Sequence, residues 1–122
     1  MARSQQIGRL GETTAARFLK DAGYSILDRN YRCEYGEIDI VARMEEMIVF
    51  VEVKTRQSLK FGLPEESITR AKSGRLIQSA EMYLNENDLI DVDWRIDLVA
   101  IQVDSDNQIV DISHIIGAID SW

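Results

Sequence analysis

The sequence predicts one α/β domain, with a mixed β-sheet, flanking helices and the element order α-β-β-β-α-β-β. Two observations support this fold class. Segments rich in valine and isoleucine, typical of strands, are interspersed with two longer segments in which apolar residues recur at helical spacing. The length of 122 residues is that of a single domain, so we expect one domain over residues 1–122.

The first helix is expected over residues 4–22, with Ser4 as its N-cap and Gly23 just past its end. The second helix is expected over residues 64–85, opened by Pro64, which is the single proline of the chain. Five strands are expected, over residues 24–31, 37–43, 48–56, 94–103 and 108–114.

The net charge of −7 argues against indiscriminate DNA binding, because contacts to phosphate dominate nucleic-acid affinity. The charge is unevenly distributed, however. Residues 1–75 carry 13 of the 14 lysines and arginines and a net charge of +2, whereas residues 76–122 carry a net charge of −9. The N-terminal part could therefore meet a polyanion while the C-terminal part faces away. Alternatively, the acidic part only aids solubility.

Cysteine and apolar content indicate the compartment. The single cysteine, Cys33, leaves no intrachain disulfide and fits a reducing environment. The first residues lack the apolar core of a signal peptide, and no apolar run approaches the roughly 18 residues of a membrane span. We therefore expect a cytoplasmic protein without a membrane anchor. His114 is the only histidine, which argues against a histidine-based zinc site; it is expected to be a partly buried strand residue.

The second and third expected strands form a hairpin whose register follows from its turn. If the turn is centred between residues 45 and 46, Asp39 lies opposite Glu52. Glu37 then lies opposite Lys54, and all four side chains share one face of the sheet. The opposite face is expected to be a continuous apolar surface, made of Ile38, Ile40, Val49, Val51 and Val53.

Two carboxylates directly across a ladder repel each other, so Asp39 and Glu52 either stay in water or are neutralised. A hard divalent cation such as Mg²⁺ would neutralise them, since it takes oxygen ligands and keeps several waters for a substrate phosphate. Lys54 beside the pair could hold a metal-bound water or stabilise charge that develops at phosphorus. The alternative is an ordinary half-exposed strand, in which acidic, apolar and basic residues commonly alternate.

Two blocks of sequence carry a family resemblance: residues 36–42, Gly-Glu-Ile-Asp-Ile-Val-Ala, and residues 49–56, Val-Phe-Val-Glu-Val-Lys-Thr-Arg. With them the chain resembles the YraN-like family of the restriction-endonuclease-like, or PD-(D/E)xK, superfamily, which is distantly similar to archaeal Holliday-junction resolvases. The resemblance implies a restriction-endonuclease-like fold. It extends in order over nearly the whole chain, through Gly11-Glu12, Phe18-Leu19, Gly23-Tyr24, Ile26-Leu27, Asn30-Tyr31-Arg32, Gly62, Pro64, Lys72, Leu76, Ala80, Tyr83-Leu84, Arg95 and Asp97.

The same resemblance implies a metal site and a catalytic lysine. Asp39 and Glu52 would be metal ligands, with the main-chain carbonyl of Val53 as a third. Lys54 would be the catalytic lysine. The chain departs from the superfamily pattern at one position, because Ile38 stands where a proline usually precedes the aspartate.

Glu12 and three basic residues are further candidates. Resolvase-like relatives carry an acidic residue on the first helix that completes the metal site, and Glu12 occupies the corresponding place. It could equally be a solvated helix residue. Arg32, Arg56 and Lys72 flank the site in the sequence and are candidate phosphate contacts, although each could be an ordinary surface residue.

These residues lead to three hypotheses. The first is a DNA endonuclease that depends on Mg²⁺ or Mn²⁺, with branched or damaged DNA among its candidate substrates. The second is a nucleic-acid-binding module without turnover, and the third is a protein-interaction subunit of a DNA-processing complex. An enzyme needs Asp39, Glu52 and Lys54 together, so the complete set favours the enzyme. Because the domain is small, we expect a homodimer or a larger complex if it handles two DNA strands.

Overall fold

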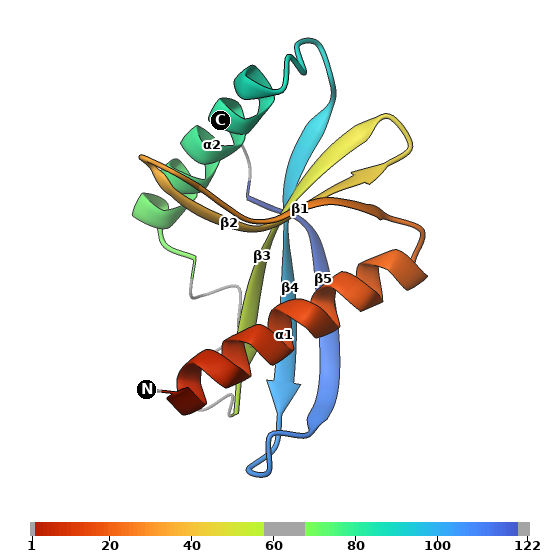
Figure 1. The fold of residues 1–122 in the computed structure, drawn as a ribbon, viewed down its shortest axis with the longest axis vertical. Coiled ribbons are helices and arrows are strands. Elements are labelled where there is room, and N and C mark those ends of the chain that lie inside the picture. The colour runs from red at the N-terminus through yellow and green to blue at the C-terminus, as the bar shows by residue number, and fades with distance from the viewer. Residues whose placement is uncertain (1, 58–67, 120–122) are drawn as a thin grey trace.

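The computed structural model describes residues 2–57 and 68–119, which form one five-stranded mixed sheet and two helices. The predicted order α-β-β-β-α-β-β is confirmed. The elements are α1 (Ala2–Asp21), β1 (Ser25–Cys33), β2 (Gly36–Met44), β3 (Met47–Arg56), α2 (Arg70–Glu86), β4 (Trp94–Val103) and β5 (Ile109–Ile119) (Figure 1).

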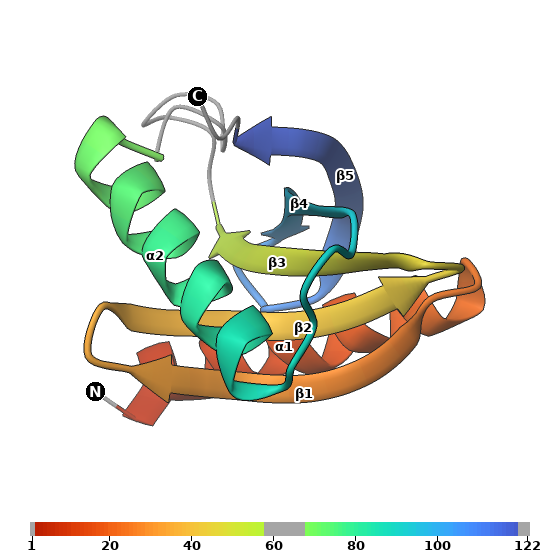
Figure 2. The ribbon, with the colours of Figure 1, turned by 90° about the horizontal axis from the view of Figure 1, so that it is seen from above.

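The strands lie side by side in chain order, β1-β2-β3-β4-β5. Neighbours are antiparallel except β3 and β4, which run parallel. Parallel neighbours need a crossover connection, and α2 lies within it. Helix α1 packs on one face of the sheet and α2 on the other, so the sheet is the middle layer of three (Figure 2).

Helix α1 ends as the sequence predicts but begins earlier. Gly23 has a φ of 99°, which glycine adopts without a steric penalty. Its N–H donates to the carbonyl of Lys20 at 3.0 Å, and the N–H of Tyr24 donates to the carbonyl of Leu19 at 2.9 Å, so a Schellman motif closes the helix. The prediction of Ser4 as N-cap is wrong, since the residues before it are also helical and place Ser4 inside the helix.

Helix α2 begins later than predicted. Its N-cap is Thr69, whose hydroxyl accepts a hydrogen bond from the N–H of Lys72 at 3.2 Å. Residues 68 and 69 are therefore not helical, and the prediction of helix there is wrong. The threonine side chain satisfies an N–H that has no partner within the helix, and this favours a start at residue 70. Pro64 lies outside the described residues.

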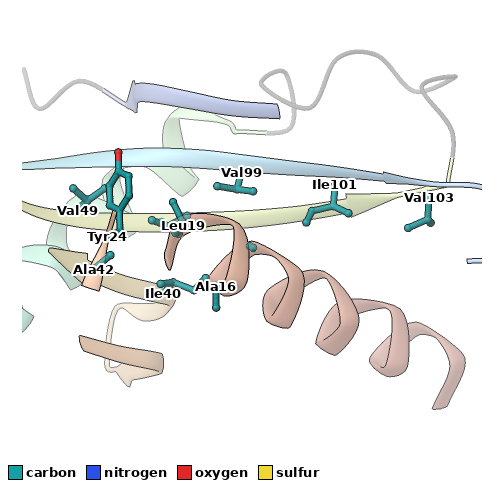
Figure 3. Close-up of a cluster of buried hydrophobic side chains, with 11 residues drawn as sticks. Ala16, Leu19, Tyr24, Ile40, Ala42, Val49, Val99, Ile101 and Val103 are labelled. Atoms are coloured by element: carbon teal, nitrogen blue, oxygen red, sulfur yellow. The ribbon is translucent and has the colours of Figure 1, made fainter. Parts of the chain in front are cut away.

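Two buried clusters hold the layers together. In the first cluster, α1 packs on the sheet through two alanines and Leu19. Figure 3 shows Ala16 and Leu19 of α1 beside Ile40 of β2 and Val99 of β4. The second cluster, under α2, is centred on aromatic rings. Phe50 of β3 packs edge-to-face on Tyr83 and on Trp94. Such aromatic pairs stabilise the fold by more than the burial of their surface area. Within the described ranges, neither helix is long and apolar enough to cross a membrane.

Candidate functional site

Strands β2 and β3 separate at the end away from their turn, and this fork is the centre of the site. Their register is the one predicted, and Ile40 opposite Val51 is the pair farthest from the turn. Beyond it, β2 stays paired with β1, while β3 continues along β4 as far as Arg56. Figure 1 shows the two pairs of strands turning away from each other. Asp39 and Glu52 are the first residues inside the fork.

The alternation of side chains breaks at Asp39, so the prediction of a continuous apolar face is wrong. Ile38 packs in the cluster under α2, whereas Ile40 packs in the cluster under α1. Asn30 lies between the β1 partners of these two residues and has a left-handed φ of 56°, so β1 is irregular at the same level. As a result, Asp39 lines a hollow against α1, and Glu52 lines a second hollow against α2.

The carboxyl groups of Asp39 and Glu52 nevertheless meet in the fork. The two groups lie within hydrogen-bonding reach, and a hydrogen bond between them requires that one of them carries a proton. Burial, followed by this hydrogen bond and the charge of Glu52, raises the pKa of Asp39 to about 8. The N–H of Val53, which donates to Asp39 Oδ2 at 2.8 Å, and the charge of Lys54 act in the opposite direction. At neutral pH, and without a cation, the pair therefore shares a proton.

The fork also explains why Val53 and Lys54 lie at the site. An N–H inside a sheet normally donates to a neighbouring strand, and where β2 has turned away the Asp39 carboxyl takes that role for Val53. Lys54 lines the α1 hollow together with Asp39. The expectation that Glu37, Asp39, Glu52 and Lys54 share one face is wrong, because Glu37 and Glu52 line the α2 hollow, whereas Asp39 and Lys54 line the α1 hollow.

Glu12 reaches the fork because α1 approaches β3 closely. Gly11 is buried, and a Cβ added to it would lie 1.9 Å from Thr55 Oγ1, so the approach requires glycine. The next residue, Glu12, lines the α1 hollow with Asp39. Burial, and then the charges of Asp39 and Glu37, raise the pKa of Glu12. The structure thus places Glu12 beside Asp39 rather than on a freely solvated helix face.

Sequence analysis missed Asn30 as a site residue. With its amide nitrogen turned toward the carboxylates, it donates to Glu12 Oε1 at 2.6 Å and to Glu37 Oε1 at 3.0 Å. Asparagine tolerates the left-handed backbone that this position adopts. An asparagine in the middle of a strand was the available signal, but only the fold brings it between two acidic side chains.

The α2 hollow contains two basic residues. Lys72 and Arg75, about one helical turn apart on α2, line it together with Glu37 and Glu52. Within residues 2–57 and 68–119, neither Lys72 nor Arg75 forms an ion pair. Lys72 was a predicted phosphate contact. Arg75 was missed, although a spacing of three on a helix puts both on one side.

The other two basic candidates lie near the ends of β1 and β3. Arg32 is exposed on β1, opposite Glu37, and its Nε lies 3.6 Å from Glu37 Oε1. Arg56 is the last residue of β3, half-buried and opposite Gln102 of β4. Arg32 is therefore held near the acidic residues, and Arg56 lies two residues beyond Lys54.

A separate buried polar cluster surrounds Asp97 of β4, which lies opposite Val51 of β3. Asp97 is fully buried and accepts hydrogen bonds from Arg95 Nε at 2.9 Å and from the N–H of Gly117 at 2.9 Å, while His114 Nε2 lies 2.8 Å from its other oxygen. Arg95 also donates to the Tyr24 hydroxyl at 2.7 Å, next to the C-terminal end of α1. This cluster fixes an irregular part of β5, which runs to residue 119 rather than 114. His114 is a partly buried strand residue, as expected.

The donor atoms of the fork fit a hard divalent cation. In the described part of the chain, no three His, Cys, Asp or Glu side chains converge into a metal site. Mg²⁺, however, is commonly held by one or two carboxylates together with waters and substrate phosphates, and Asp39 and Glu52 are two adjacent carboxyls. A cation between them would replace the shared proton and remove their repulsion.

Fold and site together define an α/β domain with two carboxyls and a lysine at the open end of a β-hairpin. The pattern of the uncharacterised protein family UPF0102 matches residues 11–101, and the chain belongs to this family. A UPF0102 protein of Roseiflexus castenholzii is 50% identical over 114 residues, 93% of this chain and 92% of the relative. Those of Moorella thermoacetica and Caldicellulosiruptor saccharolyticus are 47% and 44% identical over 111 residues, 91% of this chain and 92% and 94% of the relatives.

Proposed function

We propose that this protein is a divalent-metal-dependent DNA endonuclease with a restriction-endonuclease-like fold. The observation that carries the proposal is the contact between the Asp39 and Glu52 carboxyls inside the fork, with Lys54 beside them. Two neighbouring carboxylates repel each other and destabilise a sheet unless their charge is neutralised. A cation bound for phosphodiester hydrolysis would neutralise them, and this function uses all three side chains.

Each residue of the fork has a role in this proposal. Asp39, Glu52 and the main-chain carbonyl of Val53 hold Mg²⁺ or Mn²⁺, which when bound activates a water and polarises a phosphate oxygen. Lys54 places a positive charge next to the reacting phosphate and stabilises the negative charge that develops there. Glu12, whose pKa is raised chiefly by burial, is suited to exchange a proton with water at the site.

The basic residues around the fork provide the contacts to the DNA backbone. Lys72 lies in the hollow that Glu52 also lines, so a phosphate bound there would lie next to the scissile one. Arg32 and Arg56 extend the positive charge along the ends of β1 and β3. In this proposal the protein acts on DNA in the cytoplasm, and it acts as a homodimer or within a larger complex where two strands must be cut.

The proposal is tested by incubating the purified protein with linear, single-stranded, flapped and four-way DNA in Mg²⁺, Mn²⁺ or EDTA. Cleavage is expected with either metal and not with EDTA. Asp39→Asn should abolish it, because the amide keeps the shape of the side chain but loses the charge that binds the cation. Asp111→Asn, at an exposed aspartate of β5, is the matched control and should cleave like the parent. An Asp39→Asn protein that cleaves as well as the parent would refute the proposal.

A second comparison separates the enzyme from a binding module. Lys54→Ala should lower turnover more than DNA affinity, since its contact strengthens as charge develops at phosphorus. Lys72→Ala should instead weaken binding and reduce its salt dependence by about one counterion. If the protein only binds DNA, Lys72→Ala alone should have an effect. If it is an interaction subunit, neither change should alter DNA binding.

A further inference from the structure

Tyr35 lies at the tip of the β1–β2 hairpin. The hairpin has a two-residue turn, because Cys33 pairs with Gly36 and only Glu34 and Tyr35 lie between them. Neither Glu34 nor Tyr35 has a positive φ, so the backbone of this turn accepts most residue types at both positions. Turn geometry therefore gives no reason for a large aromatic side chain at this position.

Tyr35 is also not used to build the core. The edge-to-face pairs among the described residues join other rings, including Tyr31 with Tyr83 and Phe50 with Trp94. Tyr35 is half-exposed and belongs to neither buried cluster of the described chain. It lines the α2 hollow and also a second hollow, which Glu81, Met82 and Asn85 of α2 line as well. The side chain therefore stands between two surface hollows.

The α2 hollow brings this aromatic side chain next to phosphate-binding chemistry. Tyr35 lines it together with Lys72, Arg75 and Glu52, and Glu52 belongs to the carboxyl pair of the fork. Among residues 2–57 and 68–119 neither cation has an ion-pair partner, and an aromatic side chain beside basic residues is a combination that binds unpaired nucleotides. The base stacks on the aromatic face, and the phosphate contacts the basic side chains. In a continuous duplex the faces of internal bases are covered by their neighbours.

We propose that the hollow of Tyr35, Lys72 and Arg75 binds one unpaired nucleotide that flanks the scissile phosphate. This inference rests on the proposed endonuclease function and specifies its substrate. The strand that is cut is single-stranded, flapped or frayed next to the cleaved bond. Tyr35 holds the base by stacking, and Lys72 and Arg75 hold the adjacent phosphate.

The test measures binding of a 12-nucleotide single strand and of its duplex by fluorescence anisotropy in EDTA, so that no cleavage is needed. Tyr35→Ala should weaken binding of the single strand by about 5- to 150-fold, the effect of losing one stacked base. Binding of the duplex should change by less than about twofold. Arg75→Ala should weaken both complexes, because it removes a phosphate contact.

Two further variants separate stacking from a structural role of the side chain. Tyr35→Phe retains the ring and should bind the single strand within about twofold of the parent. Tyr35→Leu retains apolar bulk against α2 but has no π face, and should bind as weakly as Tyr35→Ala. The Phe and Leu pair therefore decides the question even if Tyr35→Ala does not fold.

Two results would overturn the inference: parental binding of the single strand by Tyr35→Leu, or equal losses of single-strand and duplex binding. Neither result affects the endonuclease proposal, which is judged by metal-dependent cleavage and Asp39→Asn. Conversely, cleavage by Asp39→Asn at the parental rate would refute the endonuclease proposal, whereas base stacking on Tyr35 would still be decided by the anisotropy measurements.

Discussion

Replacing Asp39 by asparagine should change how the stability of the metal-free protein depends on pH. The folded state raises the pKa of Asp39 from 3.8 to about 8, so between these values it holds a proton that the unfolded chain releases. The free energy of unfolding of the parent should therefore fall as pH rises through this window and become level above pH 8. Asparagine does not titrate, and it can still accept the hydrogen bond from the N–H of Val53.

The size of the effect follows from the change in pKa. One pKa unit corresponds to about 1.4 kcal/mol, so the full rise corresponds to about 6 kcal/mol as an upper bound. Asp39 is only partly buried, and solvent screening reduces this figure. We expect Asp39→Asn to gain on the order of 2–3 kcal/mol over the parent between pH 5 and pH 9.

The assay is urea unfolding of parent, Asp39→Asn and the control Asp111→Asn in EDTA, from pH 5 to pH 9. Carboxyls away from the fork titrate alike in all three proteins, so the difference between the curves reports Asp39 together with the carboxyls that it contacts. Adding Mg²⁺ above pH 8 should restore stability to the parent and to Asp111→Asn but not to Asp39→Asn. Parallel curves for parent and Asp39→Asn would show that the two carboxyls do not share a proton, and the reasoning would be refuted.

Three further predictions concern contacts that position the site. Gly11→Ala should lower the free energy of unfolding by about 1–3 kcal/mol, because its Cβ overlaps Thr55 Oγ1; pairing it with Thr55→Ala should recover part of the loss, and additive losses would contradict the contact. Asp97→Asn should cost about 3–5 kcal/mol in urea unfolding, since it leaves Arg95 without its buried partner; a loss below about 1 kcal/mol would rule out that role. Thr69→Ala should cost about 1 kcal/mol by removing the N-cap of α2, whereas Thr69→Ser should be nearly neutral; equal stability of the two variants would contradict the cap.

The sequence predicted the elements and the hairpin register because both depend on local spacing. Strand and helix periods differ, so apolar spacing distinguishes β3 from α1 without knowledge of their neighbours. A turn centred between residues 45 and 46 fixes every pair from Met44–Met47 to Ile40–Val51. Asp39 and Glu52 were therefore placed together by counting residues alone.

The prediction of side-chain faces from strand alternation is wrong where the sheet becomes irregular. Alternation predicted Ile38 and Ile40 on one face, but they lie in different clusters because β2 follows β1 away from β3 at that level. Strand twist and the packing of a helix on each face decide where a hairpin opens, and neither can be predicted from the spacing of apolar residues. The predicted start of α2 is also wrong, because Thr69 caps the helix and places its first residue at Arg70.

The sequence by itself determined that two carboxyls and a lysine lie on adjacent strands of one hairpin. Only the tertiary structure decided what surrounds them. Glu12 lies beside Asp39 because a glycine lets α1 approach β3, and Lys72 and Arg75 reach Glu52 because the crossover brings α2 onto the opposite face. These contacts join segments far apart in the chain, and their geometry is set by the packing of whole layers rather than by any local pattern.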